Sequence, residues 1–177
     1  MNLVKLFIFF FTILFCINTS AQKIAIIDIE SLIDNNPKFR EAVINIEKKQ
    51  EKDLKFFENT ENDLEIMLKD IEDSKLLLSD SEINNKINNY NIKLDELKKL
   101  VDEYNIHYQK QVIKIKEKII SEIMKLLQNY ITDNEIDLIL DSTNYLISSK
   151  SLDITEIIRQ KLDKLNIKLE YEYFKKD

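Results

Sequence analysis

The sequence predicts a mainly α-helical protein with a small β part, in which a long antiparallel helical hairpin is inserted into a small β-sheet body. Two stretches, residues 38–78 and 82–132, contain no glycine or proline and carry apolar residues at steps of three and four. Short β-branched runs lie on either side of these stretches. The chain of 177 residues is 33% charged and 44% hydrophobic, which is too apolar for plain disorder.

The first element of the chain is a predicted signal peptide, residues 1–21, which is cleaved. Lys5 supplies a positive charge, residues 6–17 are apolar with one exception, and small residues precede the cleavage point. The alternative is a retained anchor, but the apolar run is shorter than the roughly 20 residues that span a bilayer. Cys16 is the only cysteine and follows a bulky residue, so we expect no lipidation and no disulfide in the mature chain.

The mature chain is predicted to begin with a strand over residues 23–29, whose two faces are both largely apolar. Further strands are predicted over 136–141 and 145–147. Three short strands form too little sheet to stand alone. We therefore expect residues 22–37 and 133–177 to form one β-rich body that associates with identical chains.

Residues 38–132 are predicted to form the helical hairpin. Two helices of roughly 40 and 50 residues would extend about 60 to 75 Å. Ser79, at the turn, is spaced from Glu82 as in a capping box. The expected seam of the first helix is interrupted by polar residues, which we expect to let the hairpin flex. Its apolar positions are Val43, Leu54, Phe57, Leu64, Leu68, Ile71 and Leu78, and its polar positions are Glu47, Gln50, Glu61 and Lys75.

The second helix has the more continuous apolar stripe, with extra steps of four near Tyr108 and Ile119. Tyr104, Tyr108 and Tyr130 are in phase with aliphatic residues, so seam packing is favoured over an exposed role. The stripe comprises Ile83, Ile87, Tyr90, Leu94, Leu97, Val101, Tyr104, Tyr108, Val112, Ile115, Ile119, Ile123, Leu126 and Tyr130.

A last helix is predicted to open at Asp153, which is spaced from Glu156 as in a second capping box. Beyond this helix, Leu169, Tyr171 and Tyr173 alternate with charged residues. This alternation favours a final strand. The two alternatives are a tail that resembles a binding partner and a disordered tail. Asparagine is the next-best residue after glycine for left-handed backbone. It occurs where turns and helix ends are expected, at Asn35, Asn36, Asn134 and Asn144.

The composition excludes several kinds of site. Without glycine there is no GxGxxG loop, no GxxxxGK[ST] loop and no GxSxG elbow. The 26 basic and 32 acidic residues give a net charge of −6, which disfavours nucleic-acid binding. His107, the only histidine, has no second soft ligand with which to hold a metal, and we expect a solvated helix residue there. No nucleophile, base and orienting group can be assembled, so we expect no catalytic site and no cofactor.

In this order, the elements resemble the Skp/OmpH family of periplasmic chaperones. The resemblance covers the mature chain and is strongest at KIAIIDIE (residues 23–30), EIDLILDS (135–142) and Asp153-Ile154-Thr155. It implies a trimer in which the strands build a central barrel and three hairpins enclose a cavity. That cavity would hold unfolded outer-membrane proteins in the periplasm without ATP. The resemblance places Ile24, Ile26, Ile136, Leu138 and Leu140 in the assembly core and makes Asp153 the cap of the last helix.

Two features of the hairpin bear on its partners. Residues 58–82, near the turn, hold nine carboxylates and two lysines, so we do not expect binding to anionic lipid. The returning helix is more basic, and the candidate contacts with unfolded clients are Lys110 and Lys114, with Tyr104 and Tyr108 as candidates if they are not taken up by the seam. The alternative to a holdase is a structural or adaptor coiled coil of the cell envelope, whose hairpin docks one fixed partner.

Overall fold

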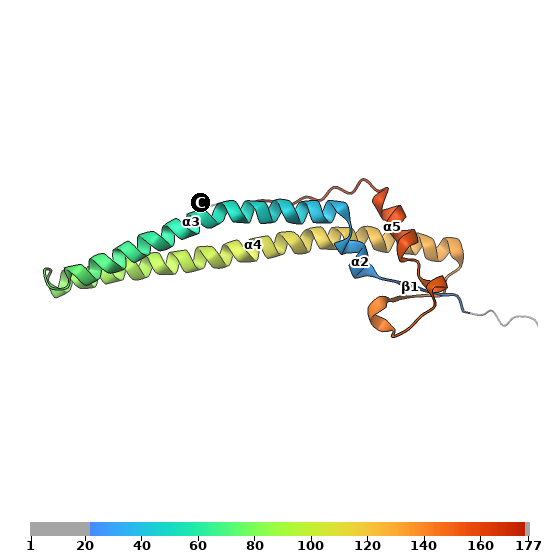
Figure 1. The fold of residues 1–177 in the computed structure, drawn as a ribbon, viewed down its shortest axis with the longest axis horizontal. Helices are drawn as coiled ribbons and strands as arrows, with labels where there is room; N and C mark the ends of the chain where they lie inside the picture. The colour runs from blue at the N-terminus through green and yellow to red at the C-terminus, as the bar shows by residue number, and fades with distance from the viewer. Residues whose placement is uncertain (1–21, 176–177) are drawn as a thin grey trace, which may run out of the picture.

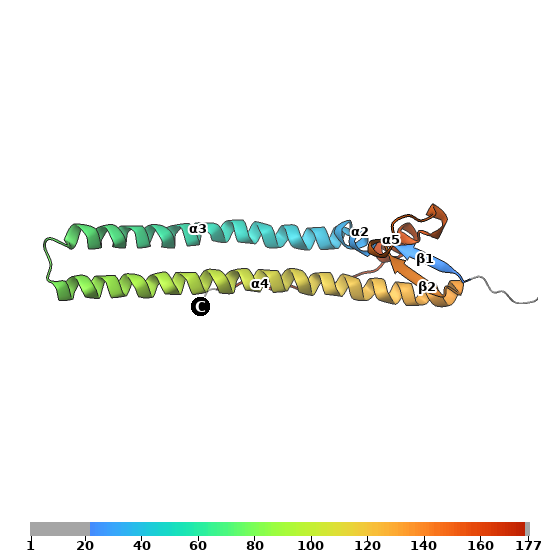
Figure 2. The same cartoon turned by 90° about the horizontal axis from the view of Figure 1, so that it is seen from below.

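The computed structural model describes residues 22–175, so the predicted signal peptide lies outside the described residues. Two long helices, α3 and α4, form an antiparallel hairpin that extends from a small body at one end (Figure 1, Figure 2). The predicted fold class is therefore confirmed. The elements in chain order are β1 (Ile24–Ile27), α2 (Ile29–Asp34), α3 (Pro37–Ser74), α4 (Asp80–Asn134), β2 (Leu138–Asp141), the short 3-10 helices η1 (Ser142–Asn144) and η2 (Lys150–Leu152), and α5 (Thr155–Asp163).

The sheet of the body joins two strands that are far apart in the sequence. β1 and β2 pair in parallel, with Ile24 opposite Leu138 and Ile26 opposite Leu140. Parallel strands require a long crossover connection, and here α2 and the hairpin supply it. The hairpin is thus an insertion between the two strands of one small sheet.

The prediction of a third strand over residues 145–147 is wrong. These residues lie between η1 and η2, and the side chains of Leu146 and Ile147 are almost fully exposed. The other edge of β1 is occupied instead by the residues before α5. The amide of Ile154 donates a hydrogen bond to the carbonyl of Ile26 at 2.9 Å, and Asp153 forms a parallel bridge with Ile26.

The body has its own hydrophobic core where β1, α2, the end of α4 and α5 meet. Ala25 and Ile27 of β1 point into it, and Ile119, Ile123 and Ile158 within it are inaccessible to solvent. Because side chains alternate along a strand, Ile24 and Ile26 lie on the opposite face. The body therefore buries one face of its sheet within a single chain.

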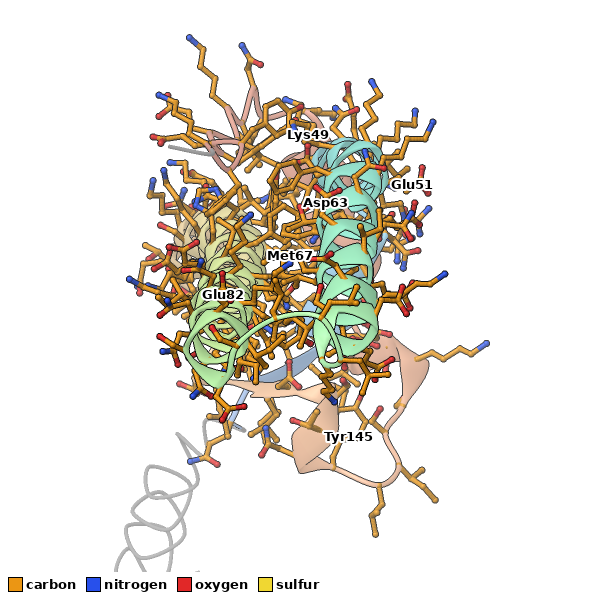
Figure 3. All side chains as sticks on the ribbon, turned by 90° about the vertical axis from the view of Figure 1, so that its left-hand side faces the viewer. Lys49, Glu51, Asp63, Met67, Glu82 and Tyr145 are labelled. Atoms are coloured by element: carbon orange, nitrogen blue, oxygen red, sulfur yellow. The ribbon has the colours of Figure 1, made fainter. Side chains whose placement is uncertain are left out.

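The buried seam follows the predicted stripe of α4 from Leu97 to Ile123 and then falls on Leu127 in place of Leu126. Along α3 it agrees with the prediction at Phe57, Leu64 and Ile71 only. The buried residues of α4 are Leu97, Tyr104, Tyr108, Ile115, Ile119, Ile123 and Leu127. Those of α3 are Ala42, Ile46, Asp53, Phe57, Leu64 and Ile71. Leu54 and Leu68, which we expected in the seam, are exposed, and so are Glu47 and Glu61. Figure 3, which looks along the hairpin from its tip, shows Met67 between the two helices and Glu51 pointing away from them.

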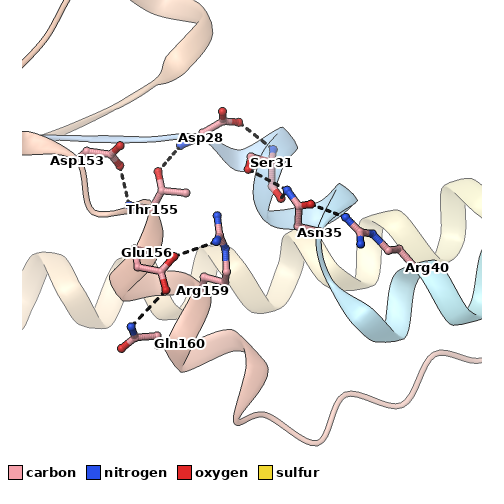
Figure 4. Close-up of polar contacts among 9 residues, drawn as sticks. All are labelled: Asp28, Ser31, Asn35, Arg40, Asp153, Thr155, Glu156, Arg159 and Gln160. Atoms are coloured by element: carbon pink, nitrogen blue, oxygen red, sulfur yellow. Dashed lines mark hydrogen bonds and ion pairs between the residues drawn. The ribbon is translucent and has the colours of Figure 1, made fainter. Parts of the chain in front are cut away.

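The capping box at the hairpin turn forms as predicted, whereas the one before α5 does not. The hydroxyl of Ser79 and the carboxylate of Glu82 accept hydrogen bonds from each other's backbone amides. At α5 the N-cap is Ile154, and Asp153 precedes it; its carboxylate still accepts from the Thr155 amide at 2.8 Å (Figure 4). The helix starts one residue later than predicted because Ile154 is held in the sheet by its bond to Ile26.

The left-handed backbone position after α4 is occupied by Glu135 and not by an asparagine. Among the described residues, Glu135 alone has a positive φ, 52°. Asn134 is the last residue of α4, and its side-chain amide donates to the carbonyl of Tyr130. Lys23 stabilises this end of the helix, since its ammonium group bonds the Asn134 carbonyl at 3.3 Å and the Glu135 carboxylate at 2.9 Å.

Candidate functional site

The outer face of the sheet presents four of the five expected assembly residues together. The parallel register places Ile24 and Ile26 beside Leu138 and Leu140. Ile24 is 36% exposed and Leu138 is 46% exposed, whereas Ile26 is buried within the chain. The fifth residue, Ile136, packs instead against the core of the chain itself.

Next to this face, the loop between β2 and α5 adds more apolar surface. Leu146 and Ile147 are 101% and 92% exposed, and Leu152 is also exposed. Figure 3 shows Tyr145 in this loop, on one side of the body. Several large apolar side chains exposed on one part of a small domain are typical of a protein–protein interface. The body thus has the kind of surface that an assembly of identical chains requires.

The two tyrosines expected to contact clients are buried in the hairpin. Tyr104 is 5% exposed and Tyr108 is 2% exposed. The ring centroid of Tyr104 lies 5.0 Å from that of Phe57 and 4.9 Å from that of Tyr108, in edge-to-face geometry. Seam packing, which the sequence spacing favours, therefore describes these two residues. Lys110 and Lys114 are exposed on α4, as a contact role requires.

A charged pair interrupts the apolar seam next to this aromatic cluster. Asp53 is 7% exposed, and its two carboxylate oxygens lie 2.5 and 2.6 Å from the ammonium nitrogen of Lys49. Burial raises the pKa of Tyr104, and the negative charge of Asp53 and the neighbouring Tyr108 raise it further. The hydroxyl of Tyr104 is buried and has no hydrogen-bond partner among residues 22–175.

The tip of the hairpin combines exposed leucines with acidic helix ends. Leu76 and Leu77 are 96% and 84% exposed in the turn between α3 and α4. Carboxylates flank them in both helices, at Glu72, Asp73, Asp80 and Glu82. Farther from the turn, Asp70 forms an ion pair with Lys86 of the other helix. The acidic tip that the sequence predicts is thus located as far from the body as the hairpin extends (Figure 2).

The C-terminal tail, defined here as residues 168–175, lies along the hairpin and is not a strand. It runs back from α5 over the hairpin and ends about midway along it (Figure 1). Leu169, Tyr171 and Phe174 pack against the seam of the hairpin. His107, predicted to be a solvated residue, bonds the tail through its ring nitrogen, 2.8 Å from the carbonyl oxygen of Glu172.

The sequence alone does not indicate that the tail packs against the hairpin. The alternation of Leu169, Tyr171 and Tyr173 indicated an extended segment, which the tail is, but not its position. The third packed side chain is Phe174, and Tyr173 is 45% exposed. The tail contacts His107, Tyr108 and Gln111 of α4 and packs against the seam that α4 shares with α3, so only the assembled hairpin shows the site.

Neither a metal site nor a membrane span is present in the part of the chain that the structure describes. Within residues 22–175, no three acidic, histidine or cysteine side chains are grouped closely enough to hold a metal ion. In the same range, no helix has the length and apolar character that crossing a bilayer requires.

Comparison with protein families gives a match to the outer membrane protein (OmpH-like) family over residues 23–162. The chain belongs to the OmpH-like family. No functionally curated protein matches the sequence significantly. Among solved structures, the OmpH-like fold is similar to a proposed outer membrane chaperone (OmpH-like) from Caulobacter crescentus CB15. That match has a TM-score of 0.63 and 13% sequence identity, and it covers 89% of this chain and 94% of the other. The OmpH-like match ends before the tail, which begins at Lys168.

Proposed function

We propose that this protein is an ATP-independent holdase chaperone of the periplasm, which binds unfolded outer-membrane proteins between the helical hairpins of a homotrimer. Membership in the OmpH-like family supports a chaperone role, as does the similarity to a proposed outer membrane chaperone. It also favours a role without enzymatic chemistry. The predicted signal peptide supports export from the cytoplasm.

The observation that carries the proposal is the shape of the single chain. A hairpin of 38-residue and 55-residue helices extends from a body whose outer sheet face is partly exposed. Association through that face brings several hairpins to one side and encloses a space between them. A wide cavity with dispersed weak contacts suits loose, reversible binding of many unfolded chains.

The partners follow from the charge distribution of the hairpin. Lys110 and Lys114 are exposed nearer the body, where they are available to acidic segments of a client. The tip is acidic, so anionic lipid surfaces repel it. We therefore propose polypeptide clients and not membranes or nucleic acids.

The test is suppression of aggregation. Urea-unfolded outer-membrane β-barrel proteins are diluted into buffer with increasing amounts of residues 22–177, and light scattering is followed. We expect stoichiometric amounts to suppress scattering for several unrelated β-barrels, while an unrelated coiled-coil protein at equal mass does not. Failure with every β-barrel contradicts the holdase and supports the alternative, an adaptor that docks one fixed partner.

A further inference from the structure

The tail is held to the hairpin mainly through its backbone. The amide of Glu172 donates to the side-chain oxygen of Gln111 at 3.0 Å, and the carbonyl of Glu172 faces the His107 ring nitrogen. Two residues on, the amide of Phe174 donates to the hydroxyl of Tyr108 at 3.3 Å. The side chains of His107, Tyr108 and Gln111 therefore contact backbone N–H and C=O groups, which every non-proline residue carries.

Apolar contacts complete the site. Leu169, Tyr171 and Phe174 face the hairpin, and the ring of Phe174 lies 5.4 Å from that of Tyr104 and 5.6 Å from that of His107, between centroids. Glu170 and Glu172, between them, are exposed. When a protein binds an extended peptide, main-chain hydrogen bonds give affinity that depends little on sequence, and contacts with alternate side chains give the specificity.

Three features of the tail bear on whether another polypeptide segment can displace it from the hairpin. It forms no regular secondary structure among the described residues, and Tyr171 and Phe174 stay partly exposed. The Tyr104 hydroxyl beside Phe174 is left without a hydrogen-bond partner in residues 22–175, which is unfavourable in a buried position. The tail also lies outside the part of the chain that matches the family, residues 23–162.

We propose that the face of α4 that carries Tyr104, His107, Tyr108 and Gln111 is a binding site for extended polypeptide segments with spaced apolar side chains. The tail of the chain occupies it and is displaced by such a segment. The identification of that segment as part of an unfolded β-barrel client rests on the proposed function. Strands of such clients alternate apolar and polar residues, as Leu169 and Tyr171 of the tail do with Glu170 and Glu172.

The experiment measures binding of a fluorescent peptide, residues 167–177, to the full mature chain and to a chain that ends at Asn166. We expect the shortened chain to bind the peptide and the full chain to bind it about tenfold or more weakly, because the attached tail competes at a high effective concentration. Equal binding to both chains, or no binding to a shortened chain that retains its helical circular dichroism, overturns the proposal.

Matched variants keep the test informative if the shortened chain does not fold. In the full chain, Phe174→Ser removes a packed side chain and should increase peptide binding, whereas Tyr173→Ser, at a half-exposed position, should leave it unchanged. In the hairpin, Gln111→Ala should weaken binding of the peptide, whereas Gln109→Ala, at an exposed position two residues away on α4, should not. Identical effects within either pair contradict a site at this face of α4.

Competition then tests the class of ligand. An unlabelled peptide of unrelated sequence that alternates tyrosine, leucine and phenylalanine with threonine and lysine should displace the tail peptide. The same residues with the apolar ones in a single block should displace it less well. Equal competition by both contradicts recognition of spaced side chains. Because this measurement needs no aggregating client, its failure is separate from failure of the holdase assay.

Discussion

Asp141, at the end of β2, connects three parts of the body through one carboxylate. Its oxygens accept hydrogen bonds from the amide and hydroxyl of Thr143 at 3.0 and 2.8 Å, and from the amide of Ile29 at 3.3 Å. The hydrogen bond from the Thr143 amide is the main cause of the lowered pKa of Asp141. Burial of the carboxylate acts to raise this pKa, whereas the hydrogen bonds from the Thr143 hydroxyl and the Ile29 amide lower it further. The ionised carboxylate thus stabilises the junction of β2, η1 and α2.

The lowered pKa predicts how Asp141 contributes to stability as pH changes. Since the folded pKa lies below the unfolded value of about 3.9, the contribution is present above about pH 4 and is lost as pH falls through the folded pKa. We expect Asp141→Asn to lower the urea midpoint at pH 7 and to have a smaller effect at pH 3. The exposed Asp163→Asn is the control. An Asp141→Asn effect that is equal at both pH values contradicts this role.

At the end of α4, the sequence does not indicate which residue takes the left-handed backbone conformation. Asparagine residues mark the helix ends correctly, but the left-handed position falls on Glu135, one residue after Asn134. Local propensity favours asparagine there. Lys23, which is more than a hundred residues away in sequence, bonds both Asn134 and Glu135, and this contact is visible only in the folded body.

At the scale of elements, the two helices of the hairpin differ in how well their seams were predicted. The stripe of α4 is continuous, so its spacing alone identifies Tyr104, Tyr108 and Ile115 as buried. The helix α3 has apolar residues on more than one face, and spacing favoured Leu54 and Leu68, which are exposed. Which of these faces is covered depends on how α4 packs, so the sequence of α3 alone does not determine its seam.

The seam of α3 also contains the buried carboxylate of Asp53 and its partner Lys49, whose side chain is 31% exposed, and we expect this pair to limit how tightly the hairpin closes. Replacing a buried ion pair by apolar residues of similar size is often neutral or stabilising by about 1 to 4 kcal/mol. We therefore expect the double variant Lys49→Met, Asp53→Leu to slow hydrogen exchange in the outer half of α3 and α4.

The matched control for this pair is Glu47→Leu, at a position that the sequence placed in the seam but that the structure exposes. It should leave exchange in the outer half unchanged. Faster exchange in the double variant, or an equal slowing in the control, contradicts the idea that this pair loosens the hairpin.

For the molecule as a whole, the topology was predictable because the strand sequences lie at both ends of an uninterrupted helical region. The parallel pairing of β1 and β2 confirms that the hairpin is an insertion. The missing third strand has a physical reason that the sequence does not contain, since the residues before α5 already occupy the second edge of β1. The docked tail was missed because the seam against which it packs forms only when the two helices are packed together.

In the proposed function, association of identical chains through the outer sheet face links this fold to a holdase. Leu138→Asp places a charge on that face, where Leu138 is 46% exposed, and should shift the protein toward single chains without loss of helical circular dichroism. Leu54→Asp, on the hairpin at 54% exposure, is the matched control and should leave the mass unchanged. Equal masses for the two variants contradict assembly through the sheet.

The most direct test of the central claim is the mass in solution of residues 22–177, measured by light scattering after size exclusion, with and without an unfolded outer-membrane β-barrel protein. We expect the protein by itself to have the mass of three chains. When the β-barrel is added, we expect a larger species of three chains with one client. A mass of one chain that does not change on addition of the client contradicts both the assembly and the holdase function.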